Sequence, residues 1–320
     1  MISSCTTYGV RKELSDIESY IMERPDSALT MLEAMDRNDL EQERDKARHA
    51  LLHAMALDKN YIDVSDDSIA QVAVDYYSKH GLEKYKARSF YYLGIAYYYQ
   101  KNYTKAILEF TKAEQAAIKS DSLYLGMSLL AQADAYSHTY NDAERLTSLQ
   151  KSLSVYNELQ RESSVDIVNF RLSQTYSNMN RYDLADSLYR SLLEKEQLSE
   201  DLRIDVIVSY AFMKMSLVNP EYHEALRLYS LLEEQYDLKY MSYVDYWSWA
   251  YCLLLSGNKD KSDDLIRQLS EVDSSVDASY WKYCIARENR DYESAFRHLE
   301  NASRQQNELV RYSLNRSLSS

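Results

Sequence analysis

The feature that most constrains the fold is an apolar pattern that recurs along the chain at intervals of about 34 to 42 residues. Its clearest copy, FYYLGIAYYYQKNYTKAILEF, contains two runs with helical spacing, separated by the polar break QKN. The two runs consist of Phe90, Leu93, Gly94 and Tyr97, followed by Tyr103, Ala106, Phe110 and Ala113. Each run lies on one face of a helix, so one copy predicts a pair of antiparallel helices.

Further copies of the pattern cover most of the chain. The second helix recurs at Tyr182, Tyr222 and Tyr292, each followed three positions later by an alanine. With the weaker copies between them, we expect about eight helix pairs over residues 12–304. Each pair exposes an apolar face that only the next pair can cover, so the pairs should stack into a solenoid that forms one continuous domain. Residues 1–11 would precede it as an N-terminal segment, and residues 305–320 would follow as a capping helix or tail.

The composition agrees with a helical chain. Two prolines and five glycines in 320 residues are too few for a sheet-rich fold, which needs more turn residues. Apolar residues make up 45% of the chain, which is enough for a continuous core. No apolar run approaches the roughly 18 residues of a membrane-spanning helix. We therefore expect an all-α fold.

The eight positions of the clearest copy resemble the signature of the tetratricopeptide repeat (TPR) family in type and spacing. The match includes the small residues Gly94 and Ala106, which let two antiparallel helices approach closely. The resemblance implies a right-handed superhelix in which the first helix of each pair lines a concave groove. On this arrangement Tyr97 and Tyr103 are structural, whereas Tyr91 and Tyr98 are exposed in the groove.

Residues offset from the interior stripe of each first helix are the candidate ligand-binding groove: Arg88, Tyr91, Ile95, Tyr98, Gln132, Phe170, Gln174, Trp247, Tyr251 and Tyr280. Large aromatic side chains bury much area at low entropic cost, so rings in a row are candidate anchors for a partner. The alternative is that the superhelix packs these rings against its own neighbours. TPR grooves that clamp a peptide carboxylate carry lysine and asparagine here, and this chain does not. Its groove favours hydrophobic recognition of an extended peptide, an amphipathic helix or sugar rings.

Charge and motif content argue against several other functions. The chain has 37 Lys and Arg against 50 Asp and Glu, so its net charge of -13 disfavours nucleic-acid binding by this region. His49 and His53 lie four residues apart, yet no third metal ligand is close, and we interpret them as structural. Cys252 and Cys284 lie in apolar helical patterns and are expected to be buried. No catalytic motif, metal site or cofactor site is predicted.

The N-terminal stretch Ile2-Ser3-Ser4-Cys5 resembles the end of a bacterial lipoprotein signal, which would make Cys5 a lipidation site. The apolar stretch of such a signal would precede Met1, so either the chain was trimmed or the match is chance. Together with the tyrosine-rich repeats, it resembles extracytoplasmic TPR proteins of Bacteroidetes, some of which continue into a membrane helix and a regulatory segment. Membrane association would then come only through a lipid anchor or a missing flanking segment.

These observations predict a non-catalytic module that binds a protein or peptide in an aromatic groove. It would be extracytoplasmic and membrane-anchored, and could be the sensor part of a regulator. An alternative is a surface lipoprotein that captures glycan or another nutrient by aromatic stacking. A cytoplasmic assembly scaffold is a third possibility, in which Cys5 is an ordinary residue.

Overall fold

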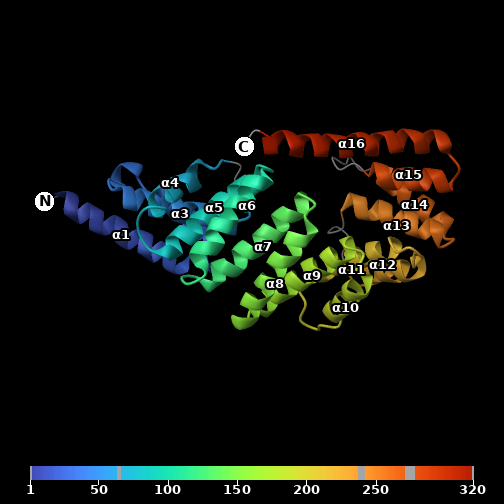
Figure 1. Cartoon of the computed structure of the whole chain (residues 1–320), viewed down its shortest axis with the longest axis horizontal. Coiled ribbons are helices and arrows are strands. Elements are labelled where there is room, and N and C mark those ends of the chain that lie inside the picture. The colour runs from blue at the N-terminus through green and yellow to red at the C-terminus, as the bar shows by residue number, and fades with distance from the viewer. Residues whose placement is uncertain (1, 63–65, 237–241, 271–277, 319–320) are drawn as a thin grey trace. The chain divides into compact units, whose positions relative to one another are not determined.

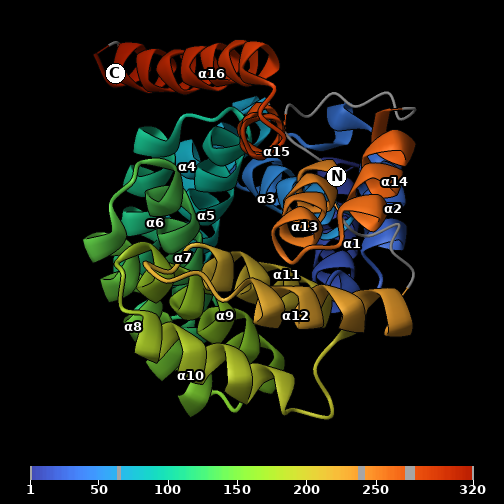
Figure 2. The same cartoon turned by 90° about the vertical axis from the view of Figure 1, so that its right-hand side faces the viewer.

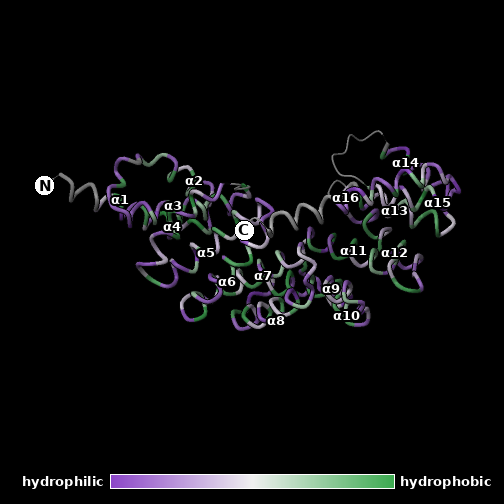
Figure 3. The backbone as a smooth tube through the Cα atoms, turned by 45° about the horizontal axis from the view of Figure 1, so that its top comes forward, coloured by the Kyte–Doolittle hydropathy of each residue, from purple (hydrophilic) through white to green (hydrophobic). Residues whose placement is uncertain are grey.

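The computed structural model describes residues 2–62, 66–236, 242–270 and 278–318, and the side chains of these ranges except at 2–7, 37, 243, 270 and 308–318 (Figure 1). The chain divides into two compact units, 1–162 and 163–319. The described residues form sixteen α-helices and one short 3₁₀ helix. Green and purple segments alternate along the tube in Figure 3, as expected for helices that bury one face. None of the described helices is long and apolar enough to cross a membrane.

Unit 1 contains four consecutive helix pairs. Its elements are α1 (Ile2–Tyr20), α2 (Pro25–Ala34), η1 (Arg37–Asp39), α3 (Glu43–Lys59), α4 (Ser68–Tyr77), α5 (Glu83–Tyr99), α6 (Tyr103–Ala117), α7 (Ser122–His138) and α8 (Asp142–Glu158). Figure 2 shows α5 and α6 lying side by side, next to α7. The core of this unit includes buried residues of α1, such as Leu14 and Ile17, and continues into α7.

Unit 2 also contains four consecutive pairs. Its helices are α9 (Glu162–Asn178), α10 (Tyr182–Leu193), α11 (Glu200–Met215), α12 (Tyr222–Gln235), α13 (Tyr243–Leu255), α14 (Lys259–Ser270), α15 (Ser279–Glu288) and α16 (Tyr292–Leu318). Buried residues from α9 to α15 form a second core. The prediction of an all-α fold built from about eight antiparallel helix pairs is therefore confirmed for the described residues.

Two predicted boundaries differ from the observed helices. Helix α1 begins at Ile2, so the boundary expected at residue 12 falls inside it. Helix α16 continues to Leu318, so the boundary expected at residue 305 also lies within one helix. Neither helix contains a proline, and so nothing in the sequence interrupts it there. That residues 12–304 form a single domain stays a prediction.

The polar breaks between helices are compact capping turns. After α5, the backbone N–H of Asn102 donates to the carbonyl of Tyr97 (2.9 Å) and that of Lys101 donates to the carbonyl of Tyr98 (2.8 Å). Lys101 adopts a left-handed conformation with φ 59°, as this type of helix end requires. The Asn102 side chain then accepts a hydrogen bond from the backbone N–H of Lys105 and caps α6. The break QKN thus ends one helix and starts the next.

Close contact within a pair depends on glycine. A Cβ atom added to Gly94 of α5 would lie 2.5 Å from Cε1 of Phe110 in α6, which is far inside van der Waals contact. A Cβ added to Gly126 of α7 would lie 2.9 Å from Cε1 of Tyr156 in α8. Both rings are buried, so they have little space into which to move. The absent side chain at Gly94 and Gly126 is therefore what lets each pair close.

Several buried tyrosines fill the space between helices, and their hydroxyls have partners inside the protein. The hydroxyls of Tyr92 and Tyr124 lie 2.9 Å apart in unit 1, and in unit 2 the hydroxyl of Tyr210 donates to Asp186 (2.6 Å). Burial raises the pKa of Tyr124 to about 12 and that of Tyr210 to about 12, so these phenols stay neutral. A buried ring with a satisfied hydroxyl fills volume without leaving a polar group unpaired.

We predict that Gly94→Ala destabilises the protein by about 1–3 kcal/mol, because the new methyl group overpacks against Phe110. Gly9→Ala is the matched control. Gly9 also lies in a helix but has nothing within 4 Å of an added Cβ, so there alanine should stabilise by up to about 1 kcal/mol. Thermal unfolding of both variants measures the difference. Equal unfolding temperatures for the two variants would contradict this account of the pair.

Candidate functional site

An apolar pocket of unit 1 lies between its first helices α5 and α7 and has a volume of about 270 Å³. Most of the lining residues come from these two helices, and the second helices α6 and α8 supply one ring each. The pocket is lined by Tyr91, Ile95, Tyr98, Phe110, Met127, Leu130, Ala131, Asp134 and Tyr156. All of them except Asp134 present carbon or an aromatic ring, so the pocket suits an apolar group.

The floor and the rim of the pocket have different exposure. Tyr91, Phe110 and Tyr156 are buried and form the floor, whereas Ile95 and Met127 are half-buried and form part of the rim. Phe110 and Tyr156 are the two rings that pack against the glycines of the facing helices, which fixes their positions. Burial raises the pKa of Tyr156 to about 12, so the floor is neutral at physiological pH.

An aromatic cluster stands at the end of the pocket next to Tyr98. The imidazole of His138 stacks on the ring of Tyr103 with centroids 4.3 Å apart and an interplanar angle of 8°, and its Nε2 lies 3.0 Å from the hydroxyl of Tyr98. Burial lowers the pKa of His138 below the ordinary histidine value of 6.5; the nearby Asp134 opposes this shift, whereas Arg145 and Lys101 add to it. The imidazole is therefore neutral at pH 7 and can form a hydrogen bond with the hydroxyl of Tyr98.

Three of the predicted groove residues in unit 1, Tyr91, Ile95 and Tyr98, come together in the pocket. The expectation that Tyr91 is exposed is wrong, because only 7% of its surface is accessible. Its ring packs edge-on against Tyr92 and Tyr124, with centroids 5.0 and 5.5 Å away. Tyr91 is therefore the floor of a pocket and not a free surface ring.

The other two predicted residues of unit 1 lie outside the pocket lining. Gln132 is buried, donates to Glu114 (2.8 Å) and accepts from Ser148 (3.2 Å), so its amide holds α7 to α6 and α8. Arg88 forms ion pairs with two carboxylates, one of them Asp121 at 2.7 Å. Both side chains are engaged within the protein.

The predicted groove residues of unit 2 are mostly buried by their neighbours. Phe170, Trp247 and Tyr251 are all buried, which corrects the expectation of a column of exposed rings. Trp281 covers Tyr251 (5.7 Å between centroids) because consecutive first helices pack closely enough to cover the rings between them. Tyr280 is the exception at 57% exposed.

The amide of Gln174 donates to the hydroxyl of Ser209 (3.3 Å) and so joins α9 to α11.

The side chain of Cys5 lies outside the described residues. Cys252 and Cys284 are buried free cysteines, as predicted. Nε2 of the buried His49 lies 2.9 Å from the carbonyl of Leu32, which gives this histidine a structural role.

The sequence analysis did not predict the residues of α7 that line the pocket. Met127, Leu130, Ala131 and Asp134 are spaced i, i+3, i+4 and i+7, which is one face of a helix. This spacing is a signal in the sequence, but it does not distinguish a pocket wall from a face that packs into the core. Only the structure shows that this face of α7 remains partly uncovered.

The comparisons with known proteins identify the fold. No family model and no curated protein matches the chain. Its structure is similar to a Rap protein complexed with Competence and Sporulation Factor, with TM-score 0.66 and 15% identity over 97% of this chain and 92% of that one. It is also similar to the apo quorum sensor NprR from B. thuringiensis, with TM-score 0.65 and 13% identity over 97% of this chain and 99% of that one. For NprR in complex with its cognate peptide NprX, the TM-score is 0.64 and the identity 14%, over 92% of this chain and 89% of that one. The chain is a TPR-like all-helical repeat protein that resembles these proteins in fold.

We predict that His138 titrates below pH 6.5, because the folded protein disfavours its charged form. The folded state then binds fewer protons than the unfolded chain, so the stability contributed by His138 is complete above pH 6.5 and is lost as the pH falls through the folded pKa. The ¹³Cε1 resonance of His138, assigned by its loss in His138→Phe, measures the midpoint. Tyr103→Ala should raise the midpoint, since it uncovers the imidazole. A wild-type midpoint at or above 6.5 would rule out this description.

Proposed function

We propose that this protein is a non-catalytic module that binds a peptide, or a peptide segment of another protein, by inserting an apolar side chain between α5 and α7. The observation that carries the proposal is the pocket itself, which has a neutral aromatic floor and a mouth on the first helices of two consecutive pairs. Its volume of about 270 Å³ is below the roughly 300–1,000 Å³ typical of sites that enclose a whole small ligand. It suits one anchoring side chain of a longer partner.

The structural likeness supports a peptide as the ligand. NprR, which has a similar fold over most of its length, has been solved in complex with its cognate peptide NprX. A Rap protein of similar fold has been solved with Competence and Sporulation Factor. We therefore propose a regulatory role for this chain in which peptide binding is the input.

The rim gives the ligand more than an apolar anchor. The hydroxyl of Tyr98 and the carboxylate of Asp134 can meet the backbone or polar groups of a peptide beside the anchor. Burial of one large apolar side chain contributes about 1.5–3 kcal/mol, which is too little for stable binding alone. Further contacts along α5 and α7 are therefore part of the proposal.

Glycan capture by stacking is less well supported. It requires exposed ring faces. The candidate rings for stacking are Tyr91, Phe170, Trp247 and Tyr280, and the first three are buried. Tyr280 alone among them is exposed, and one ring offers little selectivity for a sugar.

The remaining parts of the functional prediction stay proposals. The net charge of -13 supports the absence of nucleic-acid binding by this region. Lipid anchoring and an extracytoplasmic location rest on the sequence pattern that ends in Cys5, with a cytoplasmic location as the alternative. Labelling of cells with a radioactive fatty acid tests the lipid anchor. The label should be incorporated into the wild-type protein but not into Cys5→Ser. A wild-type protein without label would contradict lipid anchoring.

We predict that peptides selected on the wild-type protein from a phage-displayed random library contain an apolar anchor residue that is bound in this pocket. Replacement of the anchor by alanine should weaken binding about ten- to hundredfold. In protein labelled with ¹³C at the methionine methyl groups, the peptide should shift the resonance of Met127, which lines the pocket. The methyl resonance of Met213, which is buried in unit 2, should not shift.

A pair of matched variants separates the pocket from the rest of the surface. Leu130→Trp fills the pocket and should weaken peptide binding at least tenfold, whereas Leu108→Trp adds the same ring to an exposed position of α6 and should leave binding unchanged. Selected peptides that bind Leu130→Trp as tightly as wild type would disprove the proposed site.

A further inference from the structure

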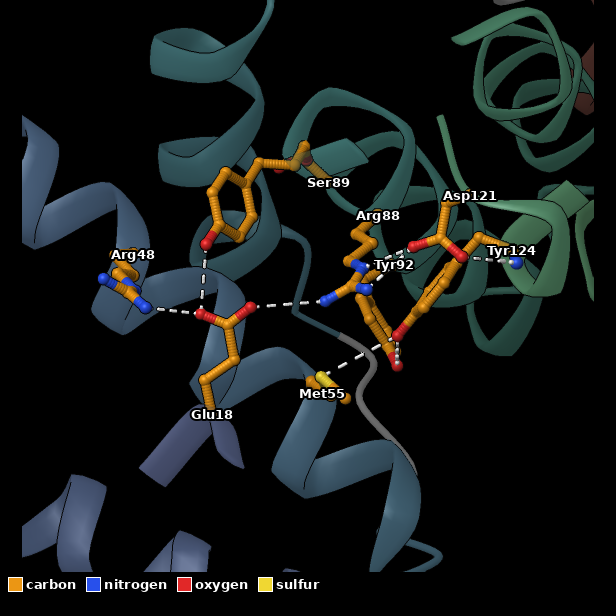
Figure 4. Close-up of polar contacts among 9 residues, drawn as sticks. Glu18, Arg48, Met55, Arg88, Ser89, Tyr92, Asp121 and Tyr124 are labelled. Carbon is orange, nitrogen blue, oxygen red and sulfur yellow. Dashed lines mark hydrogen bonds and ion pairs between the residues drawn. The ribbon is translucent and has the colours of Figure 1, made fainter. Parts of the chain in front are cut away.

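A half-buried carboxylate in α1 joins three helices of unit 1 (Figure 4). Glu18 of α1 accepts hydrogen bonds from Arg48 Nη2 of α3 (2.5 Å) and from the Tyr85 hydroxyl of α5 (3.1 Å), and it pairs with Arg88 Nη1 of α5 (3.4 Å). The side chain of Glu18 is only 16% exposed. Three donors from two other helices therefore hold this carboxylate in one place.

Arg88 extends this network to α7. Its Nε and Nη2 donate to Oδ2 of Asp121 at 2.9 and 2.7 Å, and its Cζ stands 4.9 Å from the centre of the Tyr124 ring. The other oxygen of Asp121 accepts the backbone N–H of Tyr124 (3.3 Å) and caps the first turn of α7. One guanidinium thus contacts a carboxylate of α1, the cap of α7 and a ring of α7, while it belongs to α5.

The network is continuous with the pocket through Tyr124. The Tyr124 hydroxyl lies 2.9 Å from that of Tyr92 and donates to Sδ of Met55 (3.7 Å). Its ring packs edge-on against Tyr91, which forms the pocket floor. Met127, on the opposite side of the pocket, follows Tyr124 by one helical turn in α7. Tyr124 therefore contacts one lining residue of α5 and belongs to the same helix as the α7 lining residues.

We propose that Arg88 is a positioning residue for this pocket, held from α1 by Glu18; the inference rests on the proposed function of the pocket. Arg88 lies outside the lining and acts by fixing the spacing between α5 and α7. Without its guanidinium, the carboxylates of Glu18 and Asp121 lose a shared cation, and the first turn of α7 loses its tie to α5. The N-terminal helix thereby influences binding at a site to which it contributes no residue.

The test uses the methionine methyl groups as reporters in the full chain without peptide. Arg88→Gln should shift the resonances of Met127 in the pocket and Met55 in the network, and it should weaken binding of a peptide selected on the wild type about tenfold or more. Arg88→Lys keeps the charge but not the paired N–H geometry and should restore binding in part. Arg190→Gln makes the same substitution in unit 2, where it removes a more exposed ion pair with Asp186, and it should change none of these signals.

A second variant tests whether Glu18 and Arg88 act together. Glu18→Gln should also weaken peptide binding, and the double variant with Arg88→Gln should lose less than the product of the two single effects, because both changes disrupt one network. If Arg88→Gln does not fold, Glu18→Gln alone decides the question.

Folded variants with an unchanged Met127 resonance and unchanged peptide binding would overturn the inference. If instead the peptide binds the wild type without shifting Met127, the proposed function fails. The peptide-free resonances of Arg88→Gln then still show whether Arg88 positions the pocket walls.

Discussion

The two helix pairs that form the pocket, α5–α6 and α7–α8, depend on contact between a glycine of the first helix and an aromatic ring of the second. At Gly94 and Gly126 the missing side chain is replaced by Phe110 and Tyr156, which come closer than any other residue would allow. The same two rings form the floor of the pocket. The contact that closes each helix pair therefore also sets the depth of the proposed binding site. A change at either glycine should affect stability and binding together.

The tyrosines of the chain differ in how deeply they are buried. Some are buried with a partner for the hydroxyl: the hydroxyl of Tyr92 lies 2.9 Å from that of Tyr124, and the hydroxyl of Tyr229 lies 2.8 Å from that of Ser248. In unit 1, Tyr98 combines partial exposure with a place in the pocket lining. Many aromatic residues in a repeat therefore do not by themselves identify a binding site, and only some of them line the candidate pocket.

The sequence was sufficient to predict the fold because the repeat spacing is local. The pattern at Tyr103, Ala106 and Phe110 specifies a helix and its buried face without knowledge of any other repeat. Exposure on the groove side was predicted poorly, since it depends on how far the next first helix extends over each ring. Tyr91 and Trp247 are covered for this reason, and Tyr280 is not. The Glu18–Arg88 pair joins residues 70 positions apart, and no local pattern announces it.

A crystal structure of the protein with a selected peptide tests the central claim most directly. The apolar anchor of the peptide would be replaced by 4-bromophenylalanine, so that anomalous scattering locates one atom of the ligand. We predict a bromine peak between Ile95 and Met127, above the rings of Phe110 and Tyr156. A peak elsewhere, with the side chains of α5 and α7 closed over an empty space, would contradict the account.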